Sequence, residues 1–194
     1  MVRVEAFPEM HTPVGWREQV RQLHEQQWPS PPADVTGDLG GSHDPELRPW
    51  SMLLVDEDTV LCTLDVLFKE IEHAGHELAA AGLSAVVTHP AHRRKGYGRT
   101  LVTRAREALP GLGVDLGLFT CDRELGAFYD QCGWQKLAGT VLVGGTPDEP
   151  FPSDQPGFDK ITLGAFFTPA AIQARDSLIG ARIMLYPGLI DKLW

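Results

Sequence analysis

One short basic segment of the chain combines residue types that bind phosphate. It reads His92-Arg93-Arg94-Lys95-Gly96-Tyr97-Gly98-Arg99-Thr100 and follows an apolar run at residues 83–88 that predicts a strand. Apolar residues then recur on one face of a predicted helix over residues 99–109. The unpaired N–H groups and the positive dipole end of a helix N-terminus bind phosphate oxygens, and glycines let the backbone approach the ligand. The segment therefore predicts an anion-binding loop between a strand and a helix.

Other interpretations of this segment are a solvated surface run, an ordinary glycine turn or a nucleic-acid patch. The spacing is not that of a P-loop, and Leu101 stands where a dinucleotide-binding fingerprint has its third glycine. The chain has 17 Lys and Arg against 26 Asp and Glu, a formal net charge of −9. A nucleic-acid partner would favour a basic excess, so we expect none. Confinement of basic charge to one loop favours an anionic cofactor there and a cationic partner elsewhere, although acidity alone also aids solubility.

The elements that must position this loop can be outlined from periodicity and turn residues. Thr12-Pro13 predicts a helix start, with Thr12 as the N-cap, and Pro29 ends that helix just after Trp28. Residues 30–49 are rich in Pro, Gly, Asp and Ser and predict a long surface loop. Three strands are predicted at residues 51–55, 60–71 and 77–88. Together they predict an antiparallel meander leading into the anion-binding loop.

The second half of the chain predicts further strands and a last helix. A short buried strand is expected at residues 117–121, and residues 134–143 and 158–167 predict a hairpin interrupted by a long acidic loop. Thr168-Pro169 predicts the start of a helix that runs to about residue 178. With no repeat or linker, residues 1–194 are expected to form a single domain of mixed α+β class.

Composition bears on location and on metal binding. No apolar run approaches the length of a membrane span, and the N-terminus lacks the apolar stretch of a signal peptide, so we expect a cytoplasmic protein without a membrane partner. Cys62, Cys121 and Cys132 form an odd set without metal-ligand spacing. They are expected to be reduced structural thiols, and no metal site is predicted.

Two motifs resemble those of a known family. The residues Arg93-Arg94-Lys95-Gly96-Tyr97-Gly98, after Val86-Val87-Thr88-His89-Pro90, resemble the Gln/Arg-x-x-Gly-x-Gly/Ala signature of the GCN5-related N-acetyltransferase (GNAT) family. A second motif of strand, short helix, tyrosine and Gly-aromatic pair is matched by residues 116–120 and 122–128, Tyr129 and Gly133-Trp134. The resemblance implies a central, mostly antiparallel twisted sheet flanked by helices, acetyl-CoA as cofactor, and direct attack of a primary amine on its thioester.

The resemblance also implies roles for individual residues. Tyr129 would be the general acid that returns a proton to the thiolate, because family members commonly have a tyrosine here; the alternative is an aromatic residue that only packs. Backbone and side chains of the strand, the loop and the second motif would hold acetyl-CoA. These predicted cofactor residues are Val86, Val87, Thr88, Arg93, Arg94, Lys95, Gly96, Tyr97, Gly98, Arg99, Thr100, Asp122 and Phe128.

Within the family, the chain is most similar to aminoglycoside 2′-N-acetyltransferases. The similarity runs from Ile71 through the anion-binding loop and returns in the ending Leu189-Ile190-Asp191-Lys192-Leu193-Trp194. It implies a cationic amine-bearing small molecule as partner, held by Asp38, Asp154, Asp191 and the terminal carboxylate of Trp194. The alternative is that Asp191 and Trp194 only pack the C-terminus, and the same apolar segment could serve a homodimer interface.

One position departs from the pattern of those enzymes. Ser84 stands where they carry an acidic residue that draws a proton from the amine, and serine has no comparable basicity. Ser84 with a water chain and a loop carboxylate, or Glu77 or Asp65 on the neighbouring strands, are the substitutes. Three functions stay open: acetylation of an aminoglycoside-like amino sugar, acetylation of a polyamine, amino acid or protein amine, and acetyl-CoA binding without turnover.

Overall fold

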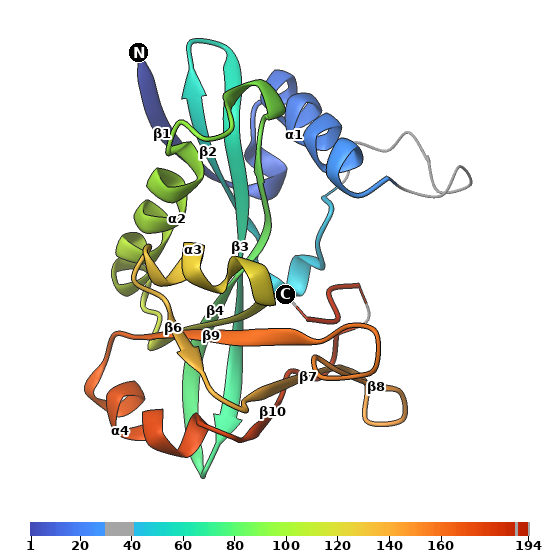
Figure 1. The fold of residues 1–194 in the computed structure, drawn as a ribbon, viewed down its shortest axis with the longest axis vertical. Coiled ribbons are helices and arrows are strands. Elements are labelled where there is room, and N and C mark those ends of the chain that lie inside the picture. The colour runs from blue at the N-terminus through green and yellow to red at the C-terminus, as the bar shows by residue number, and fades with distance from the viewer. Residues whose placement is uncertain (30–40, 189, 194) are drawn as a thin grey trace.

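The computed structural model describes residues 1–29, 41–188 and 190–193, and it has the mixed α+β architecture expected from the sequence (Figure 1). The strands are β1 Val2–Pro8, β2 Trp50–Asp56, β3 Thr59–His73, β4 His76–Thr88, β5 Leu116–Asp122, β6 Gln135–Leu137, β7 Val141–Gly145, β8 Pro150–Pro152, β9 Lys160–Phe166 and β10 Arg182–Met184. The helices are α1 Val14–Gln27, α2 Tyr97–Ala108, α3 Gly126–Asp130 and α4 Pro169–Leu178.

Seven strands form the main sheet in the order β1-β2-β3-β4-β5-β9-β6. The pairs β2–β3 and β3–β4 are antiparallel, which confirms the predicted meander, and β4 pairs with β5 in parallel. Strand β1, which the sequence analysis did not predict, adds an antiparallel edge from Val2 opposite Asp56 to Pro8 opposite Trp50. The sheet is therefore mostly antiparallel, as expected.

The two faces of the sheet are covered by different helices. In Figure 1, α1 and α2 lie on either side of the long strands β3 and β4. Successive residues of a strand face opposite ways. In β2, Leu53 packs with Val20 and Leu23 of α1, whereas Leu54 belongs to the cluster that holds Leu101 of α2. A cavity on the α1 face is thus separated by the sheet from the apolar side of α2.

Strand β4 changes direction at a bulge. Thr63 of β3 pairs with Val87 and Asp65 pairs with Ser84, so two residues of β4, Ala85 and Val86, lie opposite a single residue of β3. Ala85 has a φ of 48°, a left-handed conformation that costs energy for any residue with a Cβ. A bulge bends the strand and redirects its side chains. The described pairing of β4 with β5 is limited to Ala80 and Ala81, and beyond it the two strands diverge.

The predicted hairpin of residues 134–143 with residues 158–167 is confirmed only at its start, where β6 pairs antiparallel with β9 from Gln135 opposite Gly164 to Leu137 opposite Thr162, and it is wrong beyond that point. Strand β6 ends at Leu137, and β9 lies between β5 and β6. Gly139 adopts a left-handed φ of 71° in a turn closed by the Thr140 N–H and the Leu137 carbonyl at 3.3 Å. This turn, which a glycine permits, sends β7 into a second sheet of order β10-β7-β8.

The N-caps of α1 and α4 can be compared with those predicted from the sequence. Helix α1 has Pro13 as its N-cap, with no side-chain cap, so Thr12 does not cap it as predicted. Thr168 caps α4 through Ala171 N–H as expected. The three cysteines are buried and form no disulfide. Within the described residues, no helix is both long and apolar enough to cross a membrane.

Candidate active site

Two cavities meet beside the β4 bulge. The first, which we call the α2 cleft, has a volume of about 710 Å³ and lies where β4 and β5 diverge at the N-terminus of α2. The second, the α1 cavity, has a volume of about 280 Å³ and lies between α1 and the sheet. Trp28 lines both. Ala85 lines the α1 cavity and its neighbour Val86 lines the α2 cleft, so the bulge separates the two spaces by one residue.

The N-terminus of α2 presents unpaired backbone N–H groups to the α2 cleft. Gly96 is the N-cap, with a left-handed φ of 83° and no side-chain cap, and the first helical hydrogen bond runs from Thr100 N–H to the Gly96 carbonyl at 2.9 Å. A side chain at Gly98 would approach Thr88 Oγ1 to 3.1 Å, so a glycine keeps this wall open. Free N–H groups at a helix N-terminus favour a phosphate ligand.

Basic side chains surround that helix terminus. Arg93 donates to the Thr88 carbonyl at 3.3 Å and to Gln27 Oε1 at 3.1 Å, which ties the loop to β4 and to the end of α1. The acidic Asp122 at the far wall is paired with Lys160. The predicted cofactor residues that line this cleft are Val86, Val87, Thr88, Arg93, Arg94, Gly96, Tyr97, Gly98, Arg99, Asp122 and Phe128. Lys95 and Thr100 of the predicted set do not line it.

Tyr129 is a buried residue in the lining of the α2 cleft. It is 5% exposed, and its ring makes edge contacts with Phe119 and Phe128 at centroid distances of 5.1 and 5.0 Å. Burial raises the pKa of its hydroxyl, and the neighbouring Cys121 acts in the same direction. A phenol with a raised pKa keeps its proton near neutral pH, so Tyr129 is suited to donate a proton and unsuited to act as a base.

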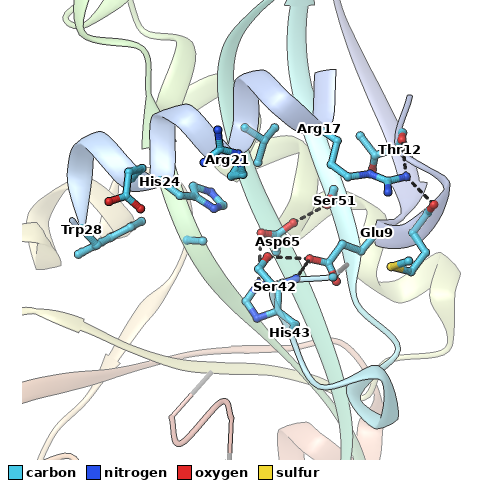
Figure 2. A pocket seen from close by; sticks show the side chains of 15 residues that line it. Glu9, Thr12, Arg17, Arg21, His24, Trp28, Ser42, His43, Ser51 and Asp65 are labelled. Atoms are coloured by element: carbon cyan, nitrogen blue, oxygen red, sulfur yellow. Dashed lines mark hydrogen bonds and ion pairs between the residues drawn. The ribbon is translucent and has the colours of Figure 1, made fainter. Parts of the chain in front are cut away.

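A polar network forms one wall of the α1 cavity. Ser51 and Asp65 are paired across β2 and β3 on the face that α1 covers, and Ser51 Oγ donates to Asp65 Oδ1 at 2.6 Å. His43 Nε2 lies 3.2 Å from Asp65 Oδ2 (Figure 2). His43 Nδ1 lies 2.7 Å from Asp191 Oδ1. The second Asp191 oxygen accepts from Asp44 N–H at 2.8 Å. Asp191 therefore fastens the C-terminal segment to this wall.

His43 is the cation of this network. Burial alone would lower the pKa of His43, but the hydrogen bonds and charges of Asp191 and Asp65 outweigh burial and raise the pKa to about 10. The side chain is 7% exposed, so its contacts are screened little by water. At neutral pH the wall thus carries an imidazolium between two carboxylates.

A second acid lies beside the His43 network in the lining of the α1 cavity (Figure 2). Glu9 is 8% exposed, and its Oε1 accepts from Ser42 N–H and Ser42 Oγ, each at 2.7 Å. Among the described residues no cation lies within ion-pair distance of Glu9. Arg17 and Arg21 also line the cavity; Arg17 donates to the Met10 and Thr12 carbonyls, and Arg21 binds Glu18.

Comparisons with known proteins identify the family of the chain. Residues 16–137 match the model of the acetyltransferase (GNAT) domain, and this stretch is more than half of the chain. The chain belongs to the GNAT acetyltransferase family. It is accordingly an N-acetyltransferase of the family that uses acetyl-CoA. The α2 cleft, with its helix N-terminus and basic loop, has the features that the anionic cofactor requires.

Solved structures share the fold at low sequence identity. Escherichia coli ElaA has 16% identity and a TM-score of 0.56 over 84% of this chain and 99% of its own. An acyl-CoA N-acyltransferase from Pseudomonas aeruginosa has 19% identity and a TM-score of 0.56 over the same shares. A Bacillus subtilis acetyltransferase in complex with CoA has 15% identity and a TM-score of 0.55 over 87% and 100%. No curated protein matches the sequence significantly. These comparisons give no support for the expected closeness to aminoglycoside 2′-N-acetyltransferases.

The residues predicted to bind the acceptor are dispersed in the acetyltransferase. Asp191 is bound to His43 and Asp44, and Asp154 pairs with Arg182 at 3.2 Å beside the second sheet. Neither lines the α1 cavity. Asp38 and Trp194 lie outside the described residues.

Ser84 and its suggested substitutes lie at different distances from the site. Ser84 faces Asp65 across β3 and β4, so a carboxylate does lie beside the position where the related enzymes carry one, but it comes from the neighbouring strand. Ser84 itself lines neither cavity. Glu77 is exposed, opposite Glu72 near the far end of the same hairpin.

Several residues of the site were missed by the sequence analysis. Glu9 follows strand β1, which was not predicted. Trp28 was expected only to stand at the end of a helix, and no role was predicted for His24. His43 lies in a segment predicted to be a surface loop. The signal available in the sequence was an aromatic residue, Trp28, directly before the helix-ending Pro29. In the structure Trp28 is 52% exposed at the end of α1. Glu9 and His43 carry no local signal.

Proposed function

We propose that the enzyme transfers the acetyl group of acetyl-CoA to a primary amine of a small cationic molecule that binds in the α1 cavity. The junction of the two cavities carries this proposal. Ala85 and Val86 are adjacent in β4 yet line different cavities, and Trp28 lines both. An acceptor in one cavity and a thioester in the other can therefore meet beside the bulge, as direct transfer in a ternary complex requires.

The acids of the α1 cavity support a cationic acceptor. A buried carboxylate without a cationic partner is costly, and Glu9 is such a group among the described residues, with Oε1 bound only by Ser42. Asp65 is already paired with His43. An ammonium group of the acceptor would supply the missing partner of Glu9 through a charge-assisted hydrogen bond.

The size of the cavity favours a compact acceptor. About 280 Å³ is near the lower end of the range for small-molecule sites. This volume suits a single amino sugar ring, a polyamine segment or an amino acid. An aminoglycoside-like amino sugar belongs to this class. Of the carboxylates first expected to hold it, Asp154 and Asp191 lie outside this wall, so Glu9 takes that role in our proposal.

The chain's own residues can perform the remaining steps. Acetyl-CoA supplies an activated acetyl thioester. The α2 terminus and Arg93 would hold its pyrophosphate, and the unpaired edge of β4 beyond Ala81 would bind its extended arm. Tyr129, whose hydroxyl keeps its proton, would donate it to the departing sulfur.

Release of free coenzyme A thiol, measured with a panel of amines, tests the proposal. The panel contains glucosamine, spermidine, free lysine, a lysine-bearing peptide and kanamycin. We expect turnover with at least one of the small amines, and a Glu9→Gln variant with KM for that amine raised tenfold or more but unchanged KM for acetyl-CoA. Glu72→Gln, which removes an exposed acid at the far end of β3, is the matched control. Turnover of the peptide alone, or equal KM values in Glu9→Gln, would contradict it.

A further inference from the structure

His24 occupies an unusual position in the α1 cavity. It lies in the second half of α1, and Figure 2 shows its ring pointing from the helix into the space in front of the strands, on the side of Asp65. The Nε2 atom is buried and has no hydrogen-bond partner among the described residues. A buried polar atom without a partner is destabilising unless a ligand satisfies it. The geometry thus leaves an unused acceptor or donor atom facing the cavity.

Asp65 and His43 of the cavity wall are already engaged with each other and with neighbouring groups. Both oxygens of Asp65 accept hydrogen bonds, from Ser51 and from His43. Both ring nitrogens of His43 face carboxylates. Glu9 is suited to hold a second ammonium group or to orient the first, but its Oε1 is bound twice by Ser42.

We infer that His24 is the general base that takes a proton from the acceptor amine. The assignment rests on the proposed function, because it requires an amine in the α1 cavity. It places the base next to the bulge: Ala85 lines the cavity with His24, and Val86 lies on the cofactor side. Trp28 follows one helical turn later and lines both cavities. Its ring meets the His24 ring in an edge arrangement, with 6.0 Å between the ring centroids.

The surroundings keep His24 uncharged. Burial lowers the pKa of His24, and the imidazolium of His43 lowers it further. Three interactions raise the pKa of His24 without overcoming burial. They are the negative charge of Asp65 on β3, a hydrogen bond with the backbone of Ala85 on β4 and the negative charge of Glu9 after β1. From α1 itself, Arg21 and Glu25 also line the cavity. A neutral imidazole at pH 7 is the form that can accept a proton.

The proton balance of the transfer is complete with this assignment. The acceptor arrives as an ammonium ion and gives one proton to His24 Nε2, which later passes it to solvent. The amine nitrogen then forms a C–N bond to the acetyl carbon as the C–S bond breaks. The nitrogen loses its second proton to water in becoming an amide, the sulfur gains one from Tyr129, and water returns one proton to Tyr129. Coenzyme A leaves as the thiol, and one proton is released overall.

The pH dependence of kcat/KM tests the role of His24 with the amine that gives the highest wild-type rate in the panel. The wild type is expected to show a plateau above the His24 pKa and a fall at lower pH. His24→Gln is expected to lose about 10²- to 10⁴-fold at pH 7, and its kcat/KM should rise tenfold per pH unit up to the pKa of the amine itself. In His24→Ala, added imidazole should restore part of the rate. His76→Gln, an exposed histidine at the turn of the β3–β4 hairpin, should behave as wild type.

The acetyl-CoA-induced rise in melting temperature, measured for each variant, identifies those that are folded and bind the cofactor. A folded His24→Gln or His24→Ala variant that keeps the wild-type plateau and its midpoint, even at a reduced rate, would overturn the assignment, since a structural role would not remove that plateau. So would a wild-type rate at pH 7. Wild-type protein that turns over no amine would refute the proposed function instead, and this result is visible without any variant.

Discussion

The His43 network predicts a specific dependence of stability on pH. The pKa of His43 rises from 6.5 to about 10 on folding. At ~1.4 kcal/mol per pH unit, the folded state gains about 5 kcal/mol from the protonated ring. Because the folded pKa is the higher one, this gain is fully present below pH 6.5 and is lost as the pH rises through 10.

The variant His43→Gln removes the cation and leaves the buried acids Asp65 and Asp191 facing each other. Loss of one partner of a buried ion pair costs about 3–5 kcal/mol, so at pH 6.5 the variant should be less stable by that amount. As the pH rises toward 10 the wild type loses its own gain, and the difference between the two proteins should shrink toward zero.

Urea unfolding between pH 6 and 10.5 measures this difference, with the fluorescence of the fully buried Trp134 as the signal. His76→Gln, an exposed substitution, should give a difference near zero at every pH. The double variant His43→Gln/Asp191→Asn should recover part of the loss at pH 6.5, because one uncompensated acid is gone. A difference between wild type and His43→Gln that stays constant with pH would refute the argument, since it would mean that His43 is neutral in the folded protein.

Three further outcomes are expected. Tyr129→Phe keeps the ring contacts and should lower kcat by about 10²-fold or more with little change in the Kd for acetyl-CoA; equal turnover would remove Tyr129 from the mechanism. Gly117→Ala would place a Cβ in steric conflict with the Trp134 ring and should cost about 1–3 kcal/mol in thermal unfolding, whereas Gly111→Ala, with open space around it, should not. Acetyl-CoA at 100 times its Kd should stabilise the protein by about 2.7 kcal/mol, and Gly96→Ala, strained at its left-handed φ, should need more cofactor for the same effect.

The strands of the meander and the anion-binding loop could be predicted because their signals are local. The alternation of apolar and polar residues over residues 51–88 reflects the local strand conformation. Likewise, the glycines at 96 and 98 reflect the local backbone conformation at the start of α2. The split of residues 134–143 into β6 and β7 was harder to predict from the sequence. Gly139 permits either a continued strand or a left-handed turn, and packing of the second sheet decides between them. The bulge at Ala85 had no local signal, since the residue there is neither glycine nor proline.

The sequence by itself determined the fold class and the family, and it predicted the anion-binding loop. It did not determine the α1 cavity, our proposed acceptor site, which only the tertiary structure assembled. Glu9, His24, His43 and Asp65 come from four separate segments and are brought together by the pairing of β1 with β2 and of β2 with β3, and by the packing of α1 on that face. A phosphate site is built from consecutive backbone N–H groups and so leaves a motif. A cavity built from distant side chains leaves none, because its geometry exists only after strand register and helix packing are fixed.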